Sequence, residues 1–256
     1  MLFRYLRFLI RSKNEHAVHS PFVFDLYTKV IKSENTYYAY DEIEQIRQQM
    51  LVSTATIAVQ DFGAGSKVNA SRQRKIKDIA RYAEKNARFG QLLFRLINHF
   101  QPAVAFDLGT SLGITTLYQA AACKKTQVFT FEGCPQTLTM ARKNFSQLGY
   151  SNITPVAGNI DQTLPAQIKQ VQQLDFVFFD ANHRLEPTLN YFALCLSKAH
   201  ADSVFIFDDI YWSAEMTQAW QAIKAHPSVM LTIDLFYVGL VFFRKNQPKQ
   251  HFVLRF

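Results

Sequence analysis

Acidic and polar side chains end a series of apolar runs in the second half of the sequence. Each run has the length of one buried strand, and each ends near a residue that accepts hydrogen bonds. A carboxylate beside such apolar sequence loses solvation free energy unless a partner offsets the loss, so a whole set of them indicates a functional site. Any single one could instead cap the helix that follows it. The set is Asp107, Glu132, Asn159, Asp180 and Asp208.

The turn after the first run, FDLGTSLG, suits a ligand without phosphates. Gly109 allows a tight turn and a close approach of the backbone to a ligand, and Gly113 opens a helix whose first amides can donate hydrogen bonds. The middle glycine of a dinucleotide fingerprint is missing, which disfavours an NAD- or flavin-dependent oxidoreductase. Glu132, 25 residues after Asp107, stands where an acid can bind both ribose hydroxyls. The pattern therefore favours an adenosine ligand.

The elements that must position these residues are strands alternating with helices. Continuous apolar strands that alternate with helices predict a parallel sheet covered on both faces, and ligands bind at the carboxyl ends of such strands. The segment VMLTIDLFYVGLVFFRK has two β-rich runs with no room for a crossover helix, so these strands must be antiparallel. We predict an α/β, Rossmann-like doubly wound sheet, mostly parallel, with a terminal antiparallel hairpin strand. The parallel runs are AVAFDL, QVFTFE, NITPVA, DFVFFD and SVFIFD.

The first fourteen residues, MLFRYLRFLIRSKN, predict a short basic amphipathic helix. Arg4, Arg7 and Arg11 share one face at helical spacing, and apolar side chains cover the other face. We expect this helix to dock on its own protein or on a second subunit, which makes a homodimer through the N-terminal helices plausible. Contact with an anionic membrane surface is the less favoured alternative.

Composition and charge narrow the class of protein. The chain of 256 residues is 48% hydrophobic and 19% charged, which excludes collagen-like and wholly disordered proteins. Its three cysteines form no CxxC motif, so they indicate neither a disulfide framework nor a zinc site and favour the reducing cytosol. Residues 1–100 hold 16 Lys and Arg against 9 Asp and Glu, so the basic excess is N-terminal. Such a charge could contact a polyanion, although a solvated helix face is the commoner explanation.

A second glycine-rich stretch, VQDFGAGSKV at residues 59–68, imitates a nucleotide-binding loop. No second apolar strand ending in an acid follows it, and the P-loop pattern is absent. We expect a loop near the mouth of the active site rather than a second cofactor site.

At these motifs the sequence resembles the class I S-adenosylmethionine-dependent methyltransferases, over about residues 88–246. The resemblance is carried by the segments FDLGTSLG, FTFEGCPQTLTMARKNF and LDFVFFDANHR. Within the class, the chain is most similar to the cation-dependent, catechol-type O-methyltransferases, through DANH and the Asp-Asp pair of SVFIFDDIYW. The resemblance implies a catalytic domain at 88–256 that binds S-adenosylmethionine, preceded by a helical and loop extension at 1–87. The implied cofactor residues are Asp107, Gly109, Thr110, Ser111, Gly113, Glu132, Asn159, Ile160 and Asp180.

The same resemblance implies a divalent cation and a general base. Asp180 and Asp208 match two of the family's metal ligands, and Asp209 stands where the family has Asn. Oxygen ligands of this kind suit Mg²⁺ or another divalent cation such as Mn²⁺ or Ca²⁺. His183 matches the position of the family's lysine base, so Asp180 and His183 are the implied catalytic residues.

The resulting prediction is an enzyme that transfers the methyl group of S-adenosylmethionine to a hydroxyl oxygen of a small molecule. Two alternatives stay open at this point. The acceptor could be RNA or another polyanion bound by the basic N-terminal region, or the protein could bind an adenosyl ligand without catalysis and act in assembly.

Overall fold

The structure, a computed structural model, describes residues 2–60, 72–245 and 247–256. The chain forms two compact units. One consists of the residues up to Ser33 together with Gln167–Phe256, and the other of Glu34–Ala166. The predicted extension at residues 1–87 is therefore divided between the two units. Among the described residues, no helix is both long and apolar enough to cross a membrane.

The Glu34–Ala166 unit contains three parallel strands in the order β3-β4-β5, which are Val104–Leu108, Gln127–Glu132 and Ile153–Ala157. These three coincide with the first three predicted runs to within one residue. A separate antiparallel pair is formed by β1 (Thr56–Ala58) and β2 (Gln73–Lys75). The helices of this unit are α3 (Tyr38–Leu51), α4 (Ile76–Tyr82), α5 (Ala87–Phe100), α6 (Ile114–Ala122), α7 (Pro135–Leu148) and α8 (Ile160–Ile168), the last of which reaches the boundary between the units.

Helix α5 shows how local sequence sets these boundaries. Asn86 caps its first turn by accepting a hydrogen bond from the Phe89 amide at 3.0 Å, and Gln101 ends it in the left-handed conformation. The Leu92, Leu93, Leu96 and Ile97 side chains are fully buried, as the helical spacing of apolar residues predicts.

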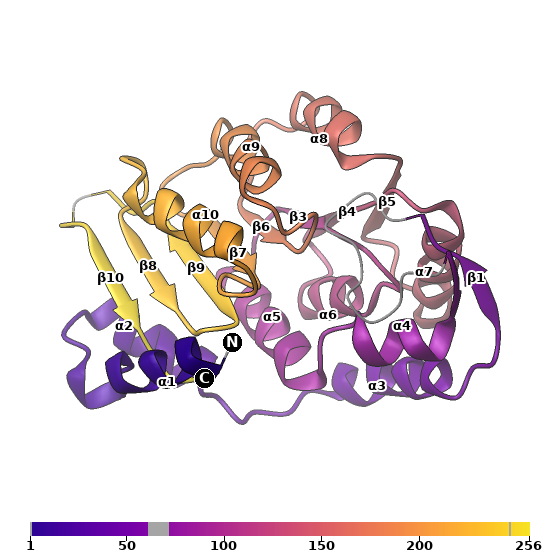
Figure 1. Cartoon of the computed structure of the whole chain (residues 1–256), viewed down its shortest axis with the longest axis horizontal. Coiled ribbons are helices and arrows are strands. Elements are labelled where there is room, and N and C mark those ends of the chain that lie inside the picture. The colour runs from indigo at the N-terminus through magenta and orange to yellow at the C-terminus, as the bar shows by residue number, and fades with distance from the viewer. Residues whose placement is uncertain (1, 61–71, 246) are drawn as a thin grey trace. The chain divides into compact units, whose positions relative to one another are not determined.

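The other unit contains five strands in the order β10-β8-β9-β7-β6, of which Figure 1 shows β10, β8 and β9 side by side in yellow. Strands β6 and β7 are parallel, whereas β9 is antiparallel to both β7 and β8. The predicted antiparallel pair is therefore confirmed. The strands are β6 (Phe176–Phe179), β7 (Val204–Asp208), β8 (Leu231–Asp234), β9 (Val238–Phe242) and β10 (Gln250–Val253).

Strand β10 is an addition that the sequence did not reveal. It pairs parallel with β8, so the chain does not end its sheet with the hairpin. Its four residues carry mixed polar and apolar side chains that are only partly buried, which leaves too short a pattern to recognise. Together the two units have the α/β, mostly parallel, Rossmann-like architecture that the sequence predicts.

The helices of this unit are α1 (Leu2–Arg11), α2 (Pro21–Leu26), α9 (Leu185–Leu196) and α10 (Ala214–Ala225), with a short 3-10 turn at Glu15–Ala17 and a π-helical turn at Tyr27–Ile31. Helix α10 packs against the strands through Trp220, whose ring lies 6.4 Å from that of Phe207. The Phe176, Phe178 and Phe205 side chains are fully buried. Bulky aromatic side chains therefore fill this core.

Helix α1 packs on its own chain, which is one of the two expected arrangements. Arg4 donates hydrogen bonds to the carbonyl oxygens of Tyr211 and Ser213, each at 3.0 Å. The apolar Leu6 and Ile10 are 50% and 86% exposed. Arg4 and the buried Phe8 therefore face the protein, whereas part of the apolar side faces solvent.

Candidate active site

The turn between β3 and α6 is held by carboxylates of the chain itself. The amide of Ser111 donates to Oε2 of Glu132 at 2.9 Å, and the amide of Leu112 donates to Oε1 of Glu84 at 2.8 Å. Asn144 on α7 donates to the Leu112 carbonyl at 2.8 Å. The backbone of Gly109 has φ +121°, a conformation that favours glycine. The turn is thus a preorganised loop.

Glu132 lies at the end of β4 and faces this turn. Its second oxygen, Oε1, accepts from the Cys134 amide at 2.8 Å, so the carboxylate links the ends of β3 and β4. Burial raises the pKa of Glu132, and the amides of Cys134 and Ser111 oppose that rise. A partly buried carboxylate at this place is suited to bind hydroxyl donors of a ligand.

The structure brings Asp107 and Thr110 together beneath the turn. Oδ2 of Asp107 accepts hydrogen bonds from the hydroxyls of Thr116 at 2.5 Å and Thr130 at 2.8 Å. The Thr110 hydroxyl lies 2.6 Å from that of Thr130. Both Asp107 and Thr110 are fully buried. These two side chains therefore support the turn from below, and their contact with a cofactor stays a prediction.

Asn159 and Ile160 occupy the start of α8, after β5. Oδ1 of Asn159 accepts a hydrogen bond from the Asp161 amide at 3.0 Å, which is the contact of a helix-capping side chain. A capping role and a place beside a bound adenine are compatible, and the second stays a prediction.

Glu84 is the site residue that the sequence analysis missed. It lies 28 positions before Leu112 and just after α4, so no local spacing connects it with the glycine turn. Its charge also raises the pKa of Glu132. Only the packing of this unit brings the two glutamates to adjacent amides of one turn.

Gly113 is the position in this turn where a side chain is excluded. A Cβ atom there would lie 2.4 Å from Cε1 of Phe145, and the backbone has φ +87°. We expect Gly113→Ala to reduce the free energy of unfolding by about 2–4 kcal/mol, because it combines overpacking with backbone strain. Gly149→Ala is the matched control, since Gly149 has φ +69° but no atom within 4 Å of its Cβ. It should cost about 1 kcal/mol in urea unfolding, and equal losses in the two variants would contradict the packing argument.

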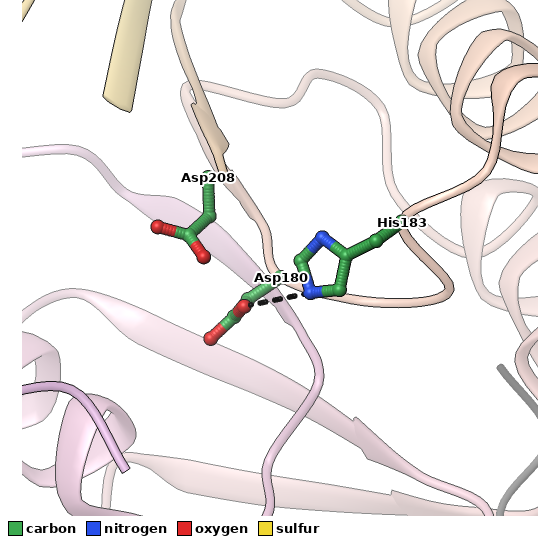
Figure 2. Close-up of side chains that lie close together, drawn as sticks. All are labelled: Asp180, His183 and Asp208. Carbon is green, nitrogen blue, oxygen red and sulfur yellow. Dashed lines mark ion pairs between the residues drawn. The ribbon is translucent and has the colours of Figure 1, made fainter. Parts of the chain in front are cut away.

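The two predicted catalytic residues, Asp180 and His183, and the predicted metal ligand Asp208 form a compact group at the ends of β6 and β7, which we call the acidic group. Asp180, His183 and Asp208 each offer one ligand atom, and these atoms all lie within 4.8 Å of one another. Nε2 of His183 is 3.3 Å from Oδ1 of Asp180. Figure 2 shows the three side chains pointing toward one another. Asp208 is 1% exposed, so a buried carboxylate stands beside a second carboxylate and an imidazole.

The backbone around this group is strained. Asn182, His183 and Asp209 have φ values of +67°, +42° and +53°. Residues other than glycine rarely adopt this region, and such strain gathers at functional sites because the surrounding structure must hold it in place. The loop after β6 thus places the His183 ring beside Asp180 at the expense of a low-energy backbone conformation.

Asp209, the third predicted metal ligand, is not a member of the group that the described residues form. Its backbone turns into the left-handed region directly after β7, and its amide donates to the Tyr237 carbonyl at 2.7 Å. His183 takes the third place instead. Neighbouring strand residues point to opposite faces, so two adjacent aspartates need not converge on one site.

Two aromatic residues follow the aspartate pair in the chain. The Trp212 ring lies 6.0 Å from that of His183, whereas the Tyr211 hydroxyl donates to Oδ2 of Asp234. Trp212 is therefore the one placed beside the acidic group. Of the second glycine-rich stretch, residues 61–68 lie outside the described residues.

Each unit thus holds features that the methyltransferase resemblance implies: one has a glycine turn linked to the acid at the end of β4, and the other has the acidic group after β6 and β7. Residues 106–210 match a family model described as a methyltransferase domain. The match supports the predicted methyltransferase domain over these residues. A search of curated proteins finds no match.

Solved structures of the same fold cover most of the chain. A putative O-methyltransferase from Klebsiella pneumoniae is 17% identical, with a TM-score of 0.60 over 87% of this chain and 96% of that one. The O-methyltransferase from Bacillus cereus in complex with SAH is 17% identical, with a TM-score of 0.55 over 86% and 97%. TomG from Streptomyces achromogenes, an O-methyltransferase solved with SAM, is 15% identical, with a TM-score of 0.59 over 87% and 95%.

Proposed function

We propose that this protein transfers the methyl group of S-adenosylmethionine to a hydroxyl oxygen of a small molecule, with a divalent cation assisting. The observation that carries the proposal is the Asp180, His183 and Asp208 group in a chain that holds a methyltransferase domain. Similar solved structures include O-methyltransferases with SAM or SAH bound, which supports the donor and the oxygen acceptor.

Residues of the Glu34–Ala166 unit would hold the donor. The Glu132 carboxylate accepts hydrogen bonds from the ribose hydroxyls, and the turn from Gly109 to Gly113 lies against the methionine end. Because the turn is fixed by Glu84 and Asn144, it loses little conformational entropy when a ligand binds.

The acidic group fits a divalent cation by the chemistry of its donors. Two carboxylates within a few ångströms repel each other, and a cation between them offsets both that repulsion and the desolvation of Asp208. When bound, such a cation lowers the pKa of an acceptor hydroxyl and orients its oxygen. Asp180, His183 and Asp208 would hold it. The imidazole favours Mn²⁺ or another transition metal over Mg²⁺, which prefers oxygen ligands alone.

The protein groups have defined roles in the displacement. The acceptor oxygen attacks the methyl carbon as the bond from carbon to sulfur breaks, which yields S-adenosylhomocysteine and a methyl ether. If His183 does not hold the cation, its Nε2 accepts the hydroxyl proton and Asp180 orients the ring. If His183 does hold the cation, the hydroxyl proton passes to solvent. Trp212 offers a flat surface beside His183 for an aromatic acceptor.

The direct test measures transfer of a labelled methyl group from S-adenosylmethionine to a panel of hydroxylated aromatic acceptors. We expect turnover that EDTA abolishes and Mn²⁺ restores better than Mg²⁺. Turnover that is insensitive to EDTA in the wild type would remove the cation from the proposal while leaving the methyltransferase. Binding of S-adenosylhomocysteine without transfer to any acceptor would favour the non-catalytic alternative, and RNA acceptance that falls steeply with salt would favour the polyanion alternative.

The affinity for S-adenosylhomocysteine should depend on pH through Glu132. The charged carboxylate is the form that accepts ribose hydroxyl donors, and burial raises its pKa above the usual value. Affinity is therefore expected to fall as the pH drops through that raised pKa, at a higher pH than an exposed glutamate would give. Isothermal titration across pH 5–8 checks this, and Glu132→Gln should flatten the profile. An unchanged slope in that variant would assign the pH dependence to another group.

A further inference from the structure

A cavity of about 260 Å³ lies outside the acidic group, between helix α1, the start of α10 and strand β10. Three arginines of α1, Arg4, Arg7 and Arg11, line one side of it. The other wall includes Tyr211 and Thr217. The volume is just below the range of about 300–1,000 Å³ for drug-sized ligands, so it suits one polar group of a molecule rather than a large apolar ligand.

The cavity has an excess of positive charge. Within the described part of the chain, none of the residues lining it is an Asp or a Glu. Asp234, the acid that contacts this wall, already accepts hydrogen bonds from the Tyr211 hydroxyl and from the Phe236 amide. Burial lowers the pKa of Lys224, the charge of Asp234 opposes that effect, and the charge of Arg11 adds a smaller lowering. The three arginines lining the cavity therefore outnumber the one described acid, Asp234, that contacts its wall.

The three arginines are not equivalent. Arg4 has a structural role, because its Nη1 donates to the Tyr211 and Ser213 carbonyls and to the Thr217 hydroxyl. For Arg7 and Arg11, no hydrogen bond or ion pair is seen among the described residues, and both are exposed. Arg7 and Arg11 thus line the cavity without a hydrogen-bond partner among the described residues, whereas Arg4 holds the helix against the opposite wall.

The helix that carries them is held independently of Arg7 and Arg11. At its C-terminal end, the Lys13 amide donates to the Val253 carbonyl at 2.8 Å and Arg255 donates to the Ser12 hydroxyl at 3.1 Å. In its middle, the Phe8 ring lies 5.3 Å from that of Phe236. Ordinary packing therefore sets the position of α1, and the placement of two arginines at the cavity is not needed for folding.

We propose that this cavity is an oxyanion-binding site, in which Arg7 and Arg11 bind a phosphate or carboxylate group of a ligand. Guanidinium groups bind such anions through paired, charge-assisted hydrogen bonds, and they carry their charge at every physiological pH. Gln221, which also lines the cavity, adds a neutral amide donor. Tyr211, which lines the cavity, directly precedes Trp212, whose ring lies 6.0 Å from that of His183. The ligand favoured here is therefore the methyl acceptor, and that assignment rests on the proposed function.

The binding test uses inorganic phosphate and pyrophosphate as probes, by isothermal titration of the full chain at constant ionic strength. We expect saturable binding that the double variant Arg7→Gln/Arg11→Gln weakens at least about 10-fold. The matched control Lys169→Gln/Lys245→Gln removes the same charge from exposed residues that do not line the cavity, and its affinity should stay within about twofold of wild type. No saturable binding, or equal losses in both variants, would overturn the site.

S-adenosylhomocysteine affinity is measured in the same variants and should not change. If the wild type does not bind S-adenosylhomocysteine, the proposed function fails but the phosphate result is unaffected. Failure of the proposed function and failure of the oxyanion site are therefore distinguishable.

The source of the oxyanion is resolved by two further comparisons. If the acceptor supplies it, 3,4-dihydroxybenzoate should be methylated with a lower KM than catechol, and only Arg7→Gln/Arg11→Gln should remove that difference. If a lipid supplies it, vesicles of phosphatidylglycerol but not of phosphatidylcholine should bind the protein, again only with Arg7 and Arg11 present. If the double variant changes neither the KM difference nor the binding to vesicles, the proposal is overturned.

Discussion

Asp208→Asn is expected to lower the rate of methyl transfer roughly 100-fold or more, whereas Asp209→Asn is expected to leave it within about threefold of wild type. The two residues are adjacent in sequence and undergo the same chemical change. Asp208 belongs to the buried acidic group, and Asp209 does not. In addition, Asn tolerates the left-handed backbone of Asp209, so the control should fold normally.

The measurement is the initial rate with labelled S-adenosylmethionine at several Mn²⁺ concentrations. Loss of Asp208 should also raise the Mn²⁺ concentration needed for half-maximal rate, which a purely structural defect would not do. The affinity for S-adenosylhomocysteine reports whether each variant keeps its donor site. Equal effects of the two substitutions, or no effect of either, would show that the acidic group does not act in the reaction.

Glu132→Ala is expected to weaken S-adenosylhomocysteine binding about 100-fold. The carboxylate would lose its hydrogen bonds to two ribose hydroxyls, and hydrogen bonds to charged groups contribute about 1.5–3 kcal/mol each. Two backbone amides, of Ser111 and Cys134, would also lose their acceptor. Asp161→Ala is the control, because Asp161 is an exposed acid of the same unit.

Isothermal titration at pH 7.5 gives both affinities, and thermal unfolding shows whether the variants fold. Glu132→Gln keeps one acceptor oxygen, so its affinity for S-adenosylhomocysteine should lie between those of the wild type and the alanine variant. Wild-type affinity in a folded Glu132→Ala protein would mean that this carboxylate does not bind the ribose, and the assignment of the donor site would fail.

Local pattern determined most of the secondary structure of this protein. The five parallel strands and helix α5 could be predicted to within about one residue, because continuous apolar runs and helical spacing report directly on burial. The glycine turn and Glu132 were also predictable, since a turn after one strand and an acid at the end of the next must meet in a parallel sheet.

Contacts between distant segments were decided only by the tertiary structure. Glu84 reaches the glycine turn through packing that no spacing encodes. Arg4 of α1 faces the protein because distant carbonyls of the loop before α10 accept hydrogen bonds from it. At the acidic group, His183 stands with Asp180 and Asp208 in the place predicted for Asp209, and both His183 and Asp209 have a left-handed backbone. Sequence periodicity predicts which face of a regular element is buried, but it does not predict the direction in which a side chain of a strained loop points.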